Sequence, residues 1–80
     1  MNPSRQQEVF QLIADVLNVG VEIINRQTSP RQIEGWDSVQ HLNIVLALEE
    51  ALGLQFSPED IEQMQSAGQI LDVIDAKTQP

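Results

Sequence analysis

The chain has 80 residues, 41% of them hydrophobic, and its twelve Asp and Glu against four Lys and Arg give a net charge of −8. This length and composition indicate one small domain with a modest hydrophobic core and exclude large multidomain enzyme folds. The negative charge disfavours nucleic acid and anionic lipid as partners and favours a basic protein surface. Because the chain contains no cysteine, disulfides and thiolate metal sites are excluded.

Nothing in the sequence predicts export or membrane insertion. The first eight residues are too polar for the hydrophobic region of a secretion signal. The longest apolar run, residues 44–48, is much shorter than the roughly 20 residues that span a bilayer. We therefore expect a single soluble domain over residues 1–80, without membrane insertion and cytoplasmic by default.

The first predicted helix begins near Pro3 and ends near Gly20. Proline suits the first helical position, and glycine suits the left-handed residue on which helices often end. The apolar residues between them recur every three or four positions, as on one helix face: Val9, Phe10, Ile13, Val16 and Leu17. Residues 21–36 show no sustained period and are predicted as a long loop, a feature that is often functional. The residues expected to pin the loop to the core are drawn from Val21, Ile23, Ile24 and Ile33.

The second predicted helix opens at Asp37 and Ser38, runs to about Leu52 and ends at Gly53. Its predicted buried stripe consists of Val39, Leu42, Val45, Leu46 and Leu52. The side chains predicted to face outward are Gln40, His41, Asn43, Glu50 and, as a further candidate, Glu49.

Two shorter helices are predicted to complete an all-α four-helix bundle. Ser57 followed by Pro58 and two acids is typical of a capped helix start, with Ile61 and Met64 as core contacts. Ser66 with Gln69 three residues later predicts a capping box at the start of the last helix. The inward-facing residues of that helix are predicted to be Ile70, Val73 and Ile74.

No catalytic constellation is convincing. Asp37, Ser38 and His41 lie within five residues, but on one helical turn the serine and aspartate point in different directions, which a hydrolytic triad does not allow. The acids fall at helix caps and on exposed faces, and the four glycines are isolated from one another. The sequence therefore predicts neither an enzyme nor a metal site.

Ser38 is the residue that invites a functional interpretation. Serine near a helix start is usually part of a cap. Here Asp37 is the better cap candidate, which leaves the Ser38 hydroxyl free in the first helical turn. A phosphodiester on that oxygen would lie beside unpaired backbone N–H groups and the positive end of the helix dipole.

The sequence around Ser38 resembles that of acyl carrier proteins. Asp37-Ser38-Val39 matches the family's Asp-Ser-Leu attachment motif with Val in place of Leu, and residues 46–50, 53–61 and 66–74 continue the similarity. The resemblance implies a carrier and not an enzyme, folded as a small four-helix bundle of acyl-carrier type with a long loop before helix two and a short helix three. It implies 4′-phosphopantetheine attached to Ser38, transferred from coenzyme A by a separate phosphopantetheinyl transferase with Mg²⁺ on that enzyme. The arm's thiol would hold acyl groups as thioesters, so the reactive sulfur would arrive with the prosthetic group.

The resemblance also implies partners that dock on helix two and the loop before it. The implied partners are acyl-activating ligases or synthases with basic docking patches. The carrier itself is expected to be a monomer. Gln40 and Asn43 replace acids that are common in the family, and Trp36 is unlike the housekeeping pattern, which favours a specialised stand-alone carrier. Trp36 is expected either to anchor a partner or to pack against the loop. The candidate recognition residues are Trp36, Val39, Gln40, His41, Asn43, Glu49 and Glu50.

The cargo is left open by the sequence. By analogy with the family, an acyl chain could fold back between the helices, although the same apolar residues would equally form a filled core. The candidate lining residues are Val39, Leu42, Leu46, Ile61, Ile70 and Val73. The pathway could be fatty-acid, polyketide or related specialised biosynthesis. The alternatives are an aminoacyl or hydroxyacyl carrier of the same fold, or an unmodified helical protein-interaction module.

Overall fold

The computed structural model describes residues 3–78, and all regular structure in this range is helical. The predicted all-α four-helix bundle is confirmed. A 3₁₀ turn lies inside the long loop, where no regular structure was predicted. The elements in chain order are α1 (Pro3–Leu17), η1 (Val21–Ile23), α2 (Ser38–Leu52), α3 (Pro58–Gln63) and α4 (Ala67–Thr78).

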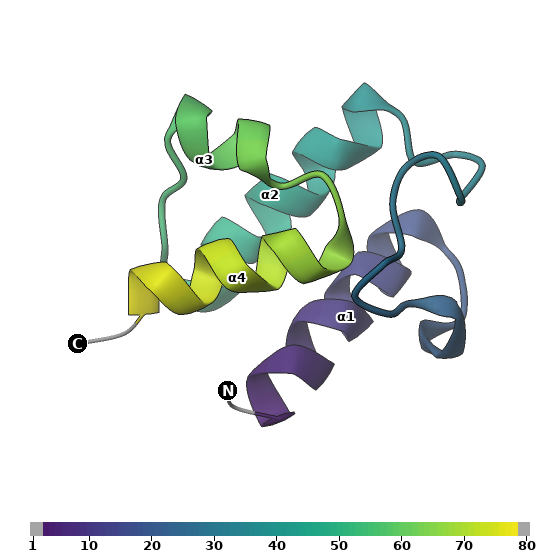
Figure 1. Ribbon diagram of the computed structural model, residues 1–80, viewed down its shortest axis with the longest axis horizontal. Helices are drawn as coiled ribbons and strands as arrows, with labels where there is room; N and C mark the ends of the chain where they lie inside the picture. The colour runs from purple at the N-terminus through teal and green to yellow at the C-terminus, as the bar shows by residue number, and fades with distance from the viewer. Residues whose placement is uncertain (1–2, 79–80) are drawn as a thin grey trace.

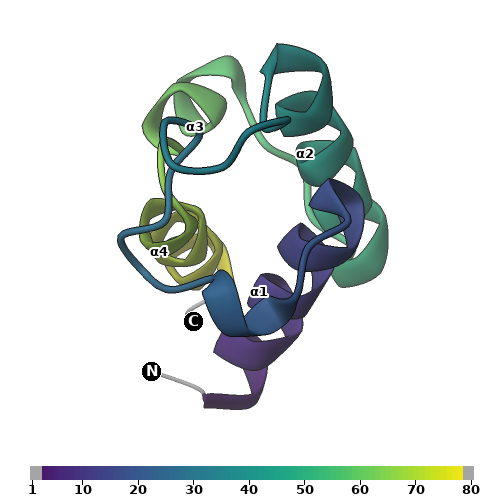
Figure 2. The ribbon, with the colours of Figure 1, turned by 90° about the vertical axis from the view of Figure 1, so that its right-hand side faces the viewer.

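The helices surround one hydrophobic core (Figures 1 and 2). α1 packs against both α2 and α4, and the short α3 packs against α4. In both views the loop between α1 and α2 passes the start of α4 on its way to the start of α2. No helix in the described part of the chain is both long and apolar enough to cross a membrane.

α1 ends earlier than predicted. The left-handed residue is Asn18, with φ of 58°, and not Gly20. The N–H of Val19 donates to the carbonyl of Ala14 at 3.0 Å, and the N–H of Asn18 donates to that of Asp15 at 3.3 Å. These two bonds form the Schellman motif, which asparagine also supports because it tolerates the left-handed region better than most residues.

α2 has its predicted boundaries but not its predicted buried face. Asp37 caps its start, and Gly53, with φ of 66°, ends it. The side chains that enter the core are Ile44, Val45 and Leu48, of which only Val45 was predicted. Val39, Leu42 and Leu46 are instead 67%, 53% and 60% exposed, and Leu52 is partly buried. The prediction was wrong because two apolar stripes run along this helix, and the spacing within each is equally helical.

The long loop is fixed to the bundle by side chains and by backbone. Ile24 and Ile33 are buried, as predicted, whereas Val21 is only partly buried and Ile23 is half-exposed. The Thr28 hydroxyl accepts a hydrogen bond from the N–H of Asn25 at 2.8 Å. The loop is therefore packed against the helices over part of its length.

The start of α4 is capped partly by this loop. The N–H of Ala67 donates to the carbonyl of Thr28 at 2.8 Å, and the N–H of Gly68 donates to that of Arg26 at 3.0 Å. The Ser66 hydroxyl accepts from the N–H of Gln69 at 3.1 Å, which is one of the two bonds of the predicted capping box. First-turn N–H groups have no partner inside their helix, and the loop carbonyls supply one.

α3 is short, but a capping box and an ion pair to α4 both stabilise it. Ser57 and Asp60 form a reciprocal capping box, with Pro58 in the first turn, as the sequence predicts. Asp60 also forms an ion pair with Lys77 at 2.7 Å, which connects α3 to the last turn of α4. Met64 is fully buried and Ile61 partly buried, so both reach the core. The predicted inward-facing residues of α4, namely Ile70, Val73 and Ile74, are all buried.

Candidate functional site

Asp37 and Ser38 divide two roles at the start of α2. An Asp37 carboxylate oxygen accepts a hydrogen bond from the N–H of Gln40 at 2.9 Å, so Asp37 is the cap. Ser38 is the first residue of the helix and is exposed to solvent. Within residues 3–78 its hydroxyl has no hydrogen-bond partner. The oxygen can therefore carry a covalent group without the loss of a hydrogen bond.

The surroundings of Ser38 fit an attached phosphate. The backbone N–H groups of Ser38 and Val39 belong to the first turn, where no carbonyl inside the helix can accept from them. The helix dipole adds partial positive charge at the same place. Both features stabilise an anion next to the Ser38 oxygen.

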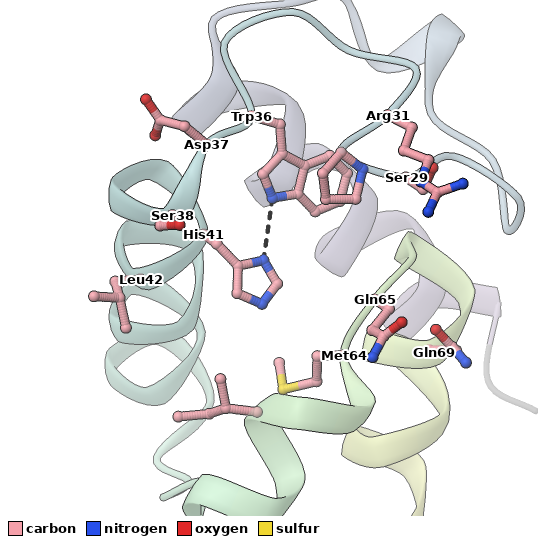
Figure 3. A pocket seen from close by; sticks show the side chains of 12 residues that line it. Ser29, Arg31, Trp36, Asp37, Ser38, His41, Leu42, Met64, Gln65 and Gln69 are labelled. Atoms are coloured by element: carbon pink, nitrogen blue, oxygen red, sulfur yellow. Dashed lines mark hydrogen bonds between the residues drawn. The ribbon is translucent and has the colours of Figure 1, made fainter.

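An open cleft of about 830 Å³ lies beside Ser38. The start of α2 and the end of the loop form one side, and α3 with the start of α4 forms the other (Figure 3). Its lining residues are Ser29, Pro30, Arg31, Trp36, Asp37, Ser38, His41, Leu42, Ile61, Met64, Gln65 and Gln69. A flexible group attached to Ser38 can therefore lie against these walls.

Trp36 and His41 are joined across the start of α2. The indole N–H of Trp36 donates to Nδ1 of His41 at 3.1 Å, and the two rings stack with their centroids 6.1 Å apart (Figure 3). Because Nδ1 accepts this bond, the neutral ring carries its proton on Nε2. Burial lowers the pKa of His41 from its ordinary value, which favours this neutral form.

The geometry does not support a hydrolytic triad. Nδ1 of His41 is occupied by Trp36, and the Asp37 carboxylate points away from the imidazole (Figure 3). The carboxylate instead accepts from the N–H of Gln40. In the described part of the chain no group of three or more His, Asp and Glu side chains is placed to hold a metal ion.

The predicted recognition residues differ in their exposure to solvent. Val39, Asn43 and Glu50 are exposed on α2, as a docking surface requires, and Gln40 and His41 are partly buried. Trp36 is only 4% exposed, so packing replaces the alternative of a surface anchor. Glu49 is also partly buried, and its carboxylate accepts from the N–H of Phe56 at 2.9 Å.

The predicted acyl-pocket residues are not brought together. Leu42 and Ile61 line the cleft beside Ser38. Val39 and Leu46 are exposed outside it, and Ile70 and Val73 are buried in the core. For Val39 and Leu46 the reason is the wrong buried face of α2. Ile70 and Val73 face the core, which agrees with the filled interior that the sequence left open as the alternative.

Several cleft residues were not predicted from the sequence. They come from the loop, the end of α3 and the start of α4, and no spacing along the chain relates them to Ser38. Met64 was predicted to be buried but not to border the site. The residues missed altogether are Ser29, Pro30, Arg31, Gln65 and Gln69.

Comparison with known families agrees with this geometry. Residues 7–74 match the family described as a phosphopantetheine attachment site. The match includes all of α2 and α3, the whole loop before α2, and most of α1 and α4. Members of this family hold 4′-phosphopantetheine covalently, which the free hydroxyl, the first-turn N–H groups and the cleft can accommodate. The chain belongs to the family of phosphopantetheine-binding carrier proteins.

Proposed function

We propose that Ser38 is the attachment residue and that the protein carries acyl groups as thioesters between enzymes of fatty-acid, polyketide or related specialised biosynthesis. The observation that carries the proposal is the exposed Ser38 hydroxyl, unpaired within residues 3–78, at the start of a helix and at the edge of a cleft. When bound, 4′-phosphopantetheine supplies the thiol that a chain without cysteine lacks.

The chain's own residues hold the attachment point still. Asp37 caps the first turn of α2 through the N–H of Gln40, and this bond helps to hold the backbone that positions the Ser38 side chain. The N–H groups of Ser38 and Val39 in the first turn of α2 would stabilise the negative charge of the linking phosphate. During attachment the Ser38 oxygen gains a bond to phosphorus and loses its proton, while the phosphoanhydride bond of coenzyme A breaks. The adenosine-containing part of coenzyme A is the leaving group.

Partner enzymes are proposed to contact the exposed apolar stripe of α2, formed by Val39, Leu42 and Leu46. The stripe begins beside the attachment residue, so an enzyme that reaches a group on Ser38 approaches these side chains. All three are more than half exposed, although they are large and apolar. The acids elsewhere on the surface, Glu50 among them, supply the negative field that steers a basic partner. Such a partner therefore presents an apolar patch with a basic surround.

The two alternative functions differ in their support. An aminoacyl or hydroxyacyl carrier has the same fold and the same attachment residue, so loading assays with different acid-activating ligases separate these cargoes. An unmodified interaction module has less support, because the family match concerns phosphopantetheine attachment. Whichever cargo the carrier holds, the proposal assigns the chemistry to a separate ligase or synthase.

The deciding experiment is the intact mass of the protein after co-expression with a broad-specificity phosphopantetheinyl transferase. We expect the mass of one phosphopantetheinyl group to be added to the wild type and to be absent from Ser38→Ala. Ser29→Ala is the matched control, because Ser29 lines the same cleft but lies in the loop. Modification of Ser38→Ala, or loss of modification in Ser29→Ala alone, would contradict the assignment. A folded wild type left unmodified by several transferases would favour the interaction module.

A further inference from the structure

The cleft beside Ser38 has polar as well as apolar walls. Leu42 and Ile61 supply apolar surface near α2 and α3, and the fully buried Met64 also borders the cleft. Across from Ser38, the walls carry the amides of Gln65 and Gln69 and the guanidinium of Arg31 (Figure 3). All three side chains are exposed and can remain hydrated, but a saturated alkyl chain offers them no hydrogen bond.

The bundle interior is already filled by its own side chains. Ile70, Ile74 and Leu71 are fully buried and belong to the core cluster, together with Met64. Protein cores are close-packed, so a long chain would have to displace these residues. The acyl group sits on the thiol at the far end of the arm, so it reaches the cleft when the arm folds back along the walls beside Ser38.

His41 presents a hydrogen-bond donor to this cleft. Trp36 occupies Nδ1, which leaves the N–H at Nε2 as the free polar group of the ring. Figure 3 shows the ring projecting from α2 with this nitrogen directed toward the Met64 side of the cleft. His41 lies three residues after Ser38, which is about one helical turn, so both side chains border the same space.

Arg31 is the cation of the cleft that the fold leaves free. Arg5, Arg26 and Lys77 pair with Glu8, Asp72 and Asp60. Among the residues that the structure describes, Arg31 is the one Arg or Lys without a carboxylate partner, and it lies on the loop wall. Its five N–H donors suit oxygen acceptors, charged or neutral.

We propose that His41 is a specificity-determining residue that favours short acyl groups bearing an oxygen acceptor over alkyl groups of the same or greater length. The donor is the Nε2–H of His41, which Trp36 orients, and Arg31 adds a preference for an acceptor that is a carboxylate. The inference rests on attachment at Ser38 and names the class of cargo that the cleft takes. With the arm folded into the cleft, an acceptor on the acyl group would accept a hydrogen bond from the Nε2–H of His41, whereas an alkyl group of the same length leaves that donor to water or to the arm, which is common to all forms.

The test compares five forms of the same protein by nitrogen NMR of the His41 ring and the Trp36 indole. A broad-specificity transferase loads the phosphopantetheine arm with a free thiol or with butyryl, hydroxybutyryl, succinyl or octanoyl groups. Intact mass confirms each form first, so a failure of attachment is recognised before the cleft is tested. We expect the His41 Nε2 signal to shift in the hydroxybutyryl and succinyl forms relative to the butyryl form. The Ile70 and Ile74 methyl signals should not move.

Three variants make the result specific. Trp36→Phe removes the donor to Nδ1, so the His41 nitrogen signals should move toward a mixture of the two neutral tautomers. If His41 selects cargo, the difference between the butyryl and hydroxybutyryl forms should also shrink in this variant, which a purely structural role does not predict. Arg31→Gln should reduce the succinyl shift and leave the hydroxybutyryl shift. Gln7→Ala, on the exposed face of α1 and away from the cleft, is the control and should change neither.

The outcomes that overturn the proposal are distinct from poor folding. Equal His41 signals in the butyryl and hydroxybutyryl forms would remove His41 from cargo selection. Octanoyl-dependent shifts at Ile70 and Ile74 would place the chain in the core instead. An Arg31→Gln protein with an unchanged succinyl shift would overturn the part assigned to the guanidinium.

Discussion

At the scale of single residues, Asp37 and Ser38 have different roles at the start of α2. Asp37 satisfies the N–H of Gln40, and this bond frees Ser38 from capping. A serine cap would have to give up a hydrogen bond in order to carry a phosphodiester. The Asp37-Ser38 pair therefore has a structural basis: Asp37 caps the helix, and the Ser38 hydroxyl stays available for attachment.

We predict that Asp37→Ala lowers the free energy of unfolding by about 1 kcal/mol, as is typical for loss of an N-cap. Asp37→Asn keeps a side-chain oxygen that accepts from Gln40 and should cost less. Urea denaturation of both variants measures the difference. Equal losses in the two variants would mean that the charge, and not the cap bond, stabilises the start of α2.

At the scale of elements, α2 carries two apolar stripes with different purposes. One stripe enters the core through Ile44, Val45 and Leu48. The other faces solvent through Val39, Leu42 and Leu46. Each has helical spacing, so the sequence pattern alone cannot tell which is buried. Packing against α1 decides it, and that contact depends on the position of the whole helix.

Leu46 and Leu48 form a matched pair for testing this assignment. We predict that Leu48→Ala lowers the free energy of unfolding by about 2–5 kcal/mol, because it empties a fully buried site. Leu46→Ala should change it by less than about 0.5 kcal/mol, since that side chain is 60% exposed. If docking uses the exposed stripe, Leu46→Ala should also slow modification by the transferase. A reversed order of stability would restore the buried stripe that the sequence suggested.

The junction of the loop with α4 gives a second prediction at this scale. A methyl group at Gly68 would lie 2.7 Å from the Arg26 carbonyl oxygen and 3.0 Å from the Arg26 Cβ. We predict that Gly68→Ala destabilises the protein by about 1–3 kcal/mol, as overpacking does, although alanine normally favours a helix. At exposed Ala76 of the same helix, Ala76→Gly should show the ordinary preference for alanine. A Gly68→Ala protein more stable than the wild type in thermal unfolding would disprove the close contact.

At the scale of the whole molecule, acid should weaken the fold in two separate ranges of pH. Burial lowers the pKa of His41 below its ordinary value of 6.5. The unfolded chain therefore binds that proton first, and stability falls as pH drops below about 6.5 toward the folded pKa. Among the cleft residues the other charged groups are Asp37 and Arg31, and Ile61 and Met64 across from the ring do not titrate.

The second range belongs to Asp60. The ion pair with Lys77 and the capping bonds with Ser57 lower the Asp60 pKa below its ordinary value of 3.8. The stabilisation is present above that value and is lost as pH falls through the folded pKa. Urea titrations from neutral pH to pH 3 should show both losses. His41→Gln should flatten the first and Asp60→Asn the second, and unchanged slopes in these variants would refute the assignment.

Local chemistry made much of the fold predictable. The starts of α2 and α3 and the end of α2 follow from caps at Asp37, Ser57 and Gly53, which act within a few residues. The pairing of Trp36 with His41 and the cleft position of Arg31 depend on how the loop turns back over the bundle, which no periodicity encodes. The predicted role of Ser38 required only the first helical turn, whereas the lining of the cleft required the tertiary structure.

The loop carbonyls that cap α4 have a consequence for how the molecule fluctuates. The amides of Ala67 and Gly68 are protected by residues that lie about forty positions earlier in the chain. Outward motion of this part of the loop would break both bonds and expose the buried first turn of α4. Protection of these two amides in hydrogen exchange therefore reports loop opening, although neither residue touches the cleft. The exchange rates would measure how often the wall beside the attachment site opens in solution.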